Sequence, residues 1–199
     1  MKTFCAILLA VSGASAFAPA QTGTSSSTRL AATEELAGLR SGAGPETAGQ
    51  VFDPAGLAEW APVDHLRKAE LSNGRSAMLA TVGWLWPKYV GTFESDDVTT
   101  LDPIKAIMEA DPQWWAQWII FCGAIEGIKY RAEAEGKSFT GDGPAAIDWT
   151  GQWGKMSAAE QEDMAVKELK NARLAMIGMG GFIANYFIPG SVPGMPEGW

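Results

Sequence analysis

A ten-residue phrase occurs twice in this chain, and each copy carries charged and polar side chains into an apolar segment. Residues 70–79 are ELSNGRSAML and residues 168–177 are ELKNARLAMI, so Glu, Leu, Asn, Arg, Ala and Met recur at matching positions. Internal repeats indicate repeated structural units. Each unit places a carboxylate, an amide and a guanidinium at the start of an apolar helical run. Such groups are costly in an apolar environment unless they are paired or bind something, so we expect the repeat to carry the function.

The bulk composition excludes several classes of protein. The 199 residues carry a formal net charge of −8 and contain no cluster of Lys and Arg, which argues against nucleic acid as a partner. His65 is the single histidine, and Cys122 is the only cysteine apart from Cys5 near the amino end. Zinc sites and Cys/His or Ser/His nucleophiles therefore lack the residues that they need. We expect that the chain is not an enzyme.

The first 32 residues have the composition of a targeting leader. Residues 1–16 combine Lys2, an apolar run and the cleavage pattern Ala14-Ser15-Ala16, as in a secretory signal peptide. Residues 17–32 are rich in Ser and Thr and contain no acidic residue, which is typical of a transit segment. The two parts resemble the leader of proteins that enter a complex plastid of the red algal lineage. Plain secretion is the alternative.

The rest of the chain is expected to be all-α, with three helices at about 63–87, 113–135 and 158–187. Pro87 would end the first helix, and Pro112 lies in the first turn of the second. Ser157 and Glu160 have the spacing of a capping box, which predicts the start of the third helix. Residues 30–60 predict a surface arm, residues 88–112 an acidic loop and residues 136–156 a glycine-rich loop.

The charges favour three membrane-spanning helices. None of the apolar runs reaches the roughly 18 uncharged residues of a simple span, so a soluble three-helix bundle is the alternative. Basic residues lie before the first and third runs and after the second, which is the same side of the membrane if each helix spans it. The acidic loop and the interfacial residues Trp86, Trp114 and Trp115 fall on the other side. We expect an amino end in the stroma and a carboxyl end in the lumen.

The spacing within the repeat predicts ion pairs between its two copies. A helix advances about 100° per residue, so Arg75 lies about 140° around the helix from Glu70 and pairs poorly with it. Reciprocal pairs, Glu70 with Arg173 and Glu168 with Arg75, satisfy all four charges across a pseudo-two-fold axis. Small residues at matching positions 74 and 172 would let the two helices cross closely.

Pairing alone does not account for the asparagine in each copy. A carboxylate that is neutralised by arginine is a net-neutral oxygen donor, and an asparagine amide is another. Magnesium prefers oxygen ligands, and a magnesium at the centre of a flat macrocycle needs only one protein atom on its axis. These donors suit chlorophyll. The alternative is a purely structural ion-pair clasp with a capping asparagine.

Both copies resemble the chlorophyll-binding motif of the light-harvesting complex superfamily. The resemblance covers about residues 64–188 and, with the leader, is similar to the chlorophyll a/c-binding antenna proteins. It implies that residues 33–199 form a three-helix chlorophyll-binding domain whose first and third transmembrane helices cross about a pseudo-two-fold axis. The family pattern implies chlorophyll ligands at Glu70 and Glu168, with Arg75 and Arg173 as their ion-pair partners.

The resemblance implies further ligands of chlorophyll magnesium. Asn171 matches the amide ligand of the third helix, and Asn73 occupies a position that is His or Asn in the family. Asn185 falls where the family has a Gln ligand. Glu126 in the second helix matches a ligand position, and Gln117 is similar to a glutamine of chlorophyll a/c members. His65, one turn before Glu70, is either a pigment ligand or a polar interface residue.

The function implied by the resemblance is that of a light-harvesting antenna of the thylakoid membrane. The implied cofactors are chlorophyll a, chlorophyll c and a carotenoid of the fucoxanthin, peridinin or alloxanthin type. The implied partners are a photosystem I or II core, neighbouring antenna subunits and thylakoid lipid. A photoprotective member, with an acid-sensing loop containing Glu94, Asp96, Asp97, Glu109 and Asp111, is the alternative. A pigment-free assembly protein, in which the repeat is only a clasp, is a third hypothesis.

Overall fold

The described part of the chain is all-α. The computed structural model describes residues 50–92, 98–140, 145, 147–148 and 150–195, and the leader and the carboxyl end lie outside these ranges. It contains four α-helices, namely α3 (Val63–Val90), α4 (Pro103–Glu109), α5 (Pro112–Ala134) and α6 (Ala158–Phe187). Two 3-10 turns, at Leu57–Glu59 and Trp153–Lys155, complete the regular structure, and no strand occurs among the described residues. The expectation of an all-α chain is confirmed.

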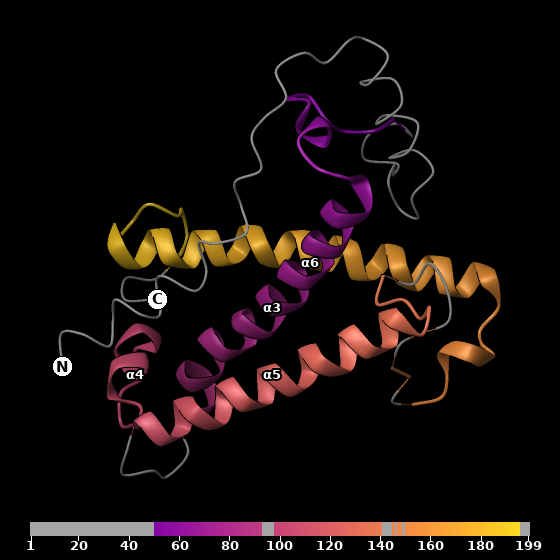
Figure 1. Cartoon of the computed structure of the whole chain (residues 1–199). Helices are drawn as coiled ribbons and strands as arrows, with labels where there is room; N and C mark the ends of the chain where they lie inside the picture. Colours follow the sequence, from indigo (N-terminus) through magenta and orange to yellow (C-terminus); the bar gives the residue numbers. More distant parts are fainter. Residues whose placement is uncertain (1–49, 93–97, 141–144, 146, 149, 196–199) are drawn as a thin grey trace.

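Helices α3 and α6 cross and form the main contact between elements (Figure 1). Gly74 of α3 and Ala172 of α6, which are equivalent positions of the repeat, lie at the crossing. Ala172 is fully buried, and a Cβ atom added to Gly74 would overlap the Cβ of Ala172. The two small residues thus allow a close helix crossing, as the repeat predicted.

The capping signals in the sequence fix the starts of two helices. The Ser157 hydroxyl accepts from the backbone N–H of Glu160, whose carboxylate accepts from the backbone N–H of Ser157, and this capping box begins α6. The Asp111 carboxylate accepts from the backbone N–H of Gln113 and begins α5, with Pro112 in the first turn. Both features follow from the hydrogen-bonding needs of a helix amino end.

The end of the first helix differs from the sequence expectation. Helix α3 does not end at Pro87 but continues to Val90, and the N–H of Gly91 donates to the Pro87 carbonyl oxygen. The proline removes one backbone donor, but the final turn closes around it and ends at Gly91, whose φ of 93° suits glycine.

The expected acidic loop contains helix α4. Asp102 caps this helix through the backbone N–H groups of Ile104 and Lys105, with Pro103 in the first turn. An Asp-Pro pair is the same signal that begins α5, so the sequence contained the information for α4. Residues 93–97, which include three of the expected acid-sensing groups, lie outside the described ranges.

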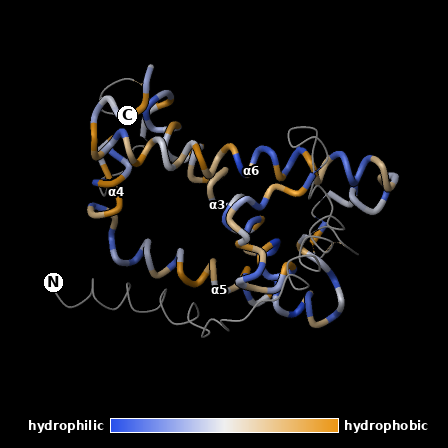
Figure 2. The backbone as a smooth tube through the Cα atoms, turned by 90° about the horizontal axis from the view of Figure 1, so that it is seen from above, coloured by the Kyte–Doolittle hydropathy of each residue, from blue (hydrophilic) through white to orange (hydrophobic). Residues whose placement is uncertain are grey.

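Helix α5 lies beside the crossed pair without extensive helix-to-helix packing (Figure 1). Only Ala132 of α5 is buried, while Trp118, Ile120 and Phe121 are exposed. Orange apolar segments recur along α3, α5 and α6 in Figure 2, interrupted by hydrophilic ones. None of the described helices combines the length and the apolarity that a membrane span requires.

Candidate functional site

The two copies of the repeat meet where α3 and α6 cross, and their charges pair reciprocally. Arg75 Nε lies 2.6 Å from Glu168 Oε1, and Arg173 Nε lies 2.8 Å from Glu70 Oε1. Each pair joins the two helices, and the four side chains are half-buried to exposed. Both ion pairs that the repeat predicts are therefore present, and each glutamate is neutralised by the other copy.

Two further contacts make the copies unequal, and the sequence analysis did not find either. Arg67, one turn before Glu70, donates from Nη1 to Glu70 Oε2 over 2.9 Å. Arg75 donates from Nη2 to the carbonyl oxygen of Phe139, in the segment after α5, over 2.8 Å. The three-residue spacing of Arg67 and Glu70 places both on one helix face and was a usable signal. The backbone acceptor at Phe139 had no signal in the sequence.

The two asparagines of the repeat are on exposed faces of their helices. Asn171 donates from Nδ2 to the carbonyl oxygen of Lys167 over 2.9 Å, which orients the amide and leaves its oxygen as an acceptor. The Asn73 amide makes no hydrogen bond within the part of the chain that the structure describes. Each asparagine follows its glutamate by three residues, so an acidic oxygen and an amide oxygen lie on the same side of each helix.

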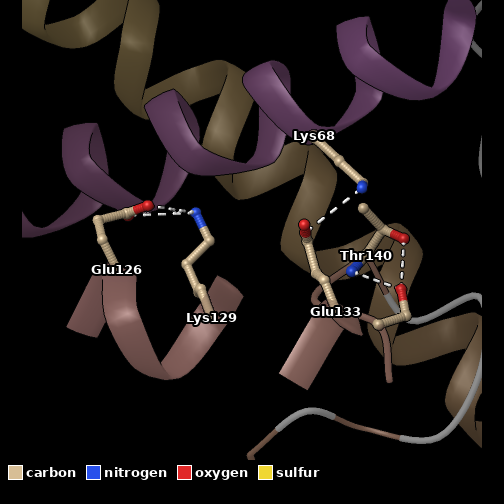
Figure 3. Close-up of polar contacts among 6 residues, drawn as sticks. Lys68, Glu126, Lys129, Glu133 and Thr140 are labelled. Carbon is tan, nitrogen blue, oxygen red and sulfur yellow. Dashed lines mark hydrogen bonds and ion pairs between the residues drawn. The ribbon is translucent and has the colours of Figure 1, made fainter. Parts of the chain in front are cut away.

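The candidate residues of α5 lie apart from the crossing. Gln117 is exposed, and Glu126 is 69% exposed and pairs with Lys129 of the same helix over 3.2 Å. Figure 3 shows this pair beside a second one, in which Lys68 of α3 reaches Glu133 of α5 over 3.3 Å. The four residues of these two pairs line a pocket of about 240 Å³ between α3 and α5, which Arg75 also lines.

Asn185 and His65 have different surroundings from the other candidates. Asn185 is 1% exposed, and its Oδ1 accepts from the backbone N–H of Gly190 over 3.2 Å. This contact holds the turn that follows α6 and favours a structural role for Asn185. His65 is exposed near the start of α3.

An aromatic cluster joins the far ends of α3 and α6. Trp84 of α3 stacks on Phe182 at 5.9 Å between ring centroids and meets the edge of Tyr186 at 6.2 Å. The Tyr186 hydroxyl donates to Asp102 Oδ2 over 3.0 Å, which ties the cap of α4 to α6. This cluster gives the carboxyl-terminal halves of α3 and α6 a second contact, away from the ion pairs of the repeat.

The electrostatics of Asp102 follow from its role as a cap. Burial alone would raise the pKa of this carboxyl. Hydrogen bonds from the backbone N–H of Lys105, the hydroxyl of Tyr186 and the backbone N–H of Ile104 together outweigh burial, so the pKa lies below its usual value. Asp102 therefore remains a carboxylate well into the acidic range.

The fold and the site define a helical protein that presents arginine-paired carboxylates on two crossed, repeat-related helices. Residues 34–187 match the family model described as "Chlorophyll A-B binding protein". The match covers most of the chain, and the chain belongs to this family.

The relatives include fucoxanthin-chlorophyll a-c binding proteins and a light-harvesting complex stress-related protein. The fucoxanthin-chlorophyll a-c binding protein C of Phaeodactylum tricornutum is 32% identical, with 93% of this chain and 95% of the relative aligned. A fucoxanthin-chlorophyll a-c binding protein of Isochrysis galbana is also 32% identical, over 83% of this chain and 85% of the relative. Light-harvesting complex stress-related protein 1 of Chlamydomonas reinhardtii is 27% identical, over 69% of this chain and 60% of the relative. All three are named as chloroplastic.

Proposed function

We propose that this protein is a light-harvesting antenna that binds chlorophyll a, chlorophyll c and a carotenoid and transfers excitation energy to a photosystem. The observation that carries the proposal is the reciprocal pairing of Glu70 and Glu168 with the arginines of the opposite copy, in a chain of the chlorophyll-binding family. The names of the fucoxanthin-chlorophyll a-c binding relatives support the choice of pigments.

The donor set fits the magnesium of chlorophyll. Glu168 accepts from Arg75 through Oε1 alone within the described part of the chain, so its second oxygen has no protein donor. The exposed amide of Asn171 offers a second, uncharged oxygen on the same helix face. Both are hard oxygen donors without net charge, which magnesium prefers in an apolar setting.

We propose as ligands Glu70, Asn73, Glu126, Glu168 and Asn171. Two further residues are weaker candidates. Gln117 is exposed and lies away from the helix crossing, and the Asn185 amide oxygen already accepts from the backbone N–H of Gly190. Bound chlorophyll supplies the light absorption and the excited state. The protein's own residues supply axial oxygen atoms, fixed separations and orientations, and local charge. They make and break no covalent bond.

The small core supports a role for pigment and lipid in completing the structure. Large apolar side chains such as Leu79, Ile120 and Ile177 are more than 70% exposed. Exposed apolar surface of this extent normally marks contact with another apolar partner. A second pocket of about 350 Å³, lined by Trp114, Trp115 and Ile107 between α4 and α5, is suited to an apolar ring or a lipid chain.

We further propose that α3, α5 and α6 lie in the thylakoid membrane, with the amino end in the stroma and the carboxyl end in the lumen. Neutral ion pairs reduce the cost of placing the charges of α3 and α6 among lipid and pigment. The basic residues at the start of α3 and the end of α5 support this orientation. A photosystem core and neighbouring antenna subunits are the proposed partners.

Reconstitution with purified pigments tests the proposal. The chain is refolded with chlorophyll a, chlorophyll c and fucoxanthin, and the excitation spectrum of chlorophyll a emission is recorded. Chlorophyll c and carotenoid bands in that spectrum are the expected result, because both would transfer energy to chlorophyll a. A folded, colourless protein would instead favour the assembly-protein hypothesis.

A photoprotective role is the second candidate. The observation in its favour is the similarity to the stress-related light-harvesting relative, at lower identity and coverage. Fluorescence lifetimes of the pigmented protein at neutral and acidic pH separate the two functions. An antenna keeps a long lifetime at both, whereas a dissipative protein shows a shortened lifetime, most strongly after acidification.

A further inference from the structure

The two copies of the repeat differ three residues before the glutamate. Arg67 precedes Glu70, whereas Ala165 occupies the matching position before Glu168. The Arg67 side chain is only 8% exposed, and its guanidinium lies 2.9 Å from Glu70 Oε2. Among the described residues, Glu70 thus contacts two guanidinium groups, from Arg67 and Arg173, and Glu168 contacts one.

This difference changes how many hydrogen bonds each carboxylate accepts, and so how well its oxygen atoms would bind a metal. In Glu70, Oε1 accepts from Arg173 and Oε2 accepts from Arg67, so each oxygen already holds a charged donor. In Glu168, only Oε1 accepts a hydrogen bond within the described ranges. A charge-assisted hydrogen bond withdraws electron density from the oxygen that accepts it. Hydrogen bonds to ligating atoms are a general means of tuning a metal site. Glu168 is therefore the stronger oxygen donor.

The two glutamates also differ in the charges that lie next to them. Arg67 brings a buried guanidinium next to the ligating group of the first copy, and Ala165 brings none to the second. A charge in a medium of low polarity acts strongly over a few ångströms. The electronic energies of a bound cofactor respond to charges and hydrogen bonds near it.

We propose that Arg67 makes the two repeat sites unequal, so that the chlorophylls ligated by Glu70 and by Glu168 absorb at different energies. This inference rests on the proposed pigment-binding function. Arg67 acts through Glu70 and is a positioning residue, not a ligand. The inequality gives excitation energy a preferred site within the pair.

The test uses the full chain reconstituted with chlorophyll a, chlorophyll c and fucoxanthin, with pigment counts and low-temperature absorption as readouts. Two paired variants first identify the bands. Glu70→Val with Arg173→Leu removes the band of the first site, and Glu168→Val with Arg75→Leu removes the band of the second. Each pair of changes deletes a ligand together with the arginine that pairs with it from the opposite copy. In the first variant Arg67 also loses its contact with Glu70, so the pigment count of that variant is read together with its stability.

The decisive variants are Arg67→Gln and Ala165→Arg. Arg67→Gln is expected to keep the full chlorophyll count, to shift the first band and to leave the second in place. Ala165→Arg is expected to shift the second band and to leave the first. Lys68→Gln is the matched control, because it removes a neighbouring positive charge that pairs with Glu133 of α5 and is expected to move neither band.

The outcomes separate this inference from the proposed function. A wild-type chain that binds no chlorophyll overturns both. A pigmented Arg67→Gln variant with an unmoved first band overturns the inference and leaves the antenna function intact. Loss of one chlorophyll from Arg67→Gln also overturns it, because Arg67 would then be required for binding instead of for tuning.

Discussion

At the scale of single residues, the candidate site consists of four charged side chains of the repeat, and these side chains differ in their number of hydrogen-bond partners. Arg75 serves two acceptors, Glu168 Oε1 and the Phe139 carbonyl oxygen. Glu70, in contrast, is held by Arg173 and also by Arg67. Removing one arginine therefore has different consequences in the two copies.

Arg75→Leu is expected to destabilise the protein more than Arg173→Leu. The first change leaves both the Glu168 carboxylate and the Phe139 carbonyl without their donor, at about 1–3 kcal/mol for an unsatisfied group. The second leaves Glu70 paired with Arg67, at a cost below about 1 kcal/mol, as for an exposed pair. Denaturant unfolding of the pigmented proteins, followed by helical circular dichroism, measures both. Equal losses would contradict this ranking, and adding Glu168→Val to Arg75→Leu should recover part of the loss.

The sequence determined the charge pairs because pairing within one helix is geometrically poor and two identical motifs were available. The repeat did not predict the contact of Arg67, because Arg67 lies outside it and the matching position of the second copy is Ala165. The acceptor at Phe139 is a backbone atom in a loop, whose position depends on the tertiary structure. The ligand assignments of Asn73, Gln117, Glu126 and Asn171 remain predictions.

At the scale of elements, the crossing of α3 and α6 depends on two side chains of minimal size. Gly74 faces the fully buried Ala172, and no room exists for a Cβ between the backbones at that point. Gly83 lies on the same helix, but a Cβ there would meet nothing within 4 Å. Substitution of the two glycines therefore distinguishes the effect of a side chain on helix packing from the effect of alanine on helix propensity.

Gly74→Ala is expected to lower the stability of the pigmented protein by about 1–3 kcal/mol, because the added methyl group forces the helices apart. Gly83→Ala is the control. It should be neutral or stabilising by up to about 1 kcal/mol, because alanine is the better helix former and its side chain is unobstructed. Thermal unfolding of both variants provides the comparison. The same loss in both would show that helix crossing does not limit stability.

Helices α3 and α4 illustrate where sequence patterns misled. Proline normally ends a helix, yet α3 passes Pro87 because its last turn is closed by Gly91. The acidic composition of residues 88–112 predicts a loop, although Asp102-Pro103 has the same form as the Asp111-Pro112 start of α5. Local capping chemistry was therefore the better guide than composition.

Asp102 also gives an expected pH dependence at this scale. Its folded-state pKa is lowered, so its contribution to stability is complete above the ordinary aspartate pKa of about 4 and is lost as the pH falls through the folded value. Wild-type stability from this group should thus be constant between neutral and mildly acidic pH. Asp102→Asn should be less stable than wild type above about pH 4, and the difference should shrink below it. Unfolding curves across this range measure the difference. Asp111→Asn is the control, because Asp111 caps α5 and Tyr186 donates to Asp102 instead. A difference that grows on acidification would contradict the assignment.

At the scale of the whole molecule, the described chain has a small core for its length. The fully buried side chains include Val63, Leu169 and Asn185, and α5 contributes only Ala132 to the buried set. Apolar burial supplies most of the free energy of folding. Pigment and lipid would therefore form much of the interior of the functional protein.

Removal of pigment is expected to abolish cooperative unfolding. Without chlorophyll and carotenoid the helices lack most of their apolar contacts, so helicity should fall and should melt over a broad range. Circular dichroism before and after pigment extraction in the same detergent measures this change. An extracted protein with full helicity and a sharp transition would contradict it, since the polypeptide alone would then hold the fold.

The two acceptors of Arg75 also bear on the order of assembly. Its guanidinium contacts Phe139, 64 positions further along the chain, and Glu168, 93 positions further along. One side chain thus closes two long loops. Closing a long loop has an entropic cost that is recovered only when the distant partner arrives. The contact with Phe139 closes the shorter loop and does not involve α6, whereas the contact with Glu168 needs α6 itself. We expect the paired motif to form late in folding, because its two ion pairs join residues that are 93 and 103 positions apart.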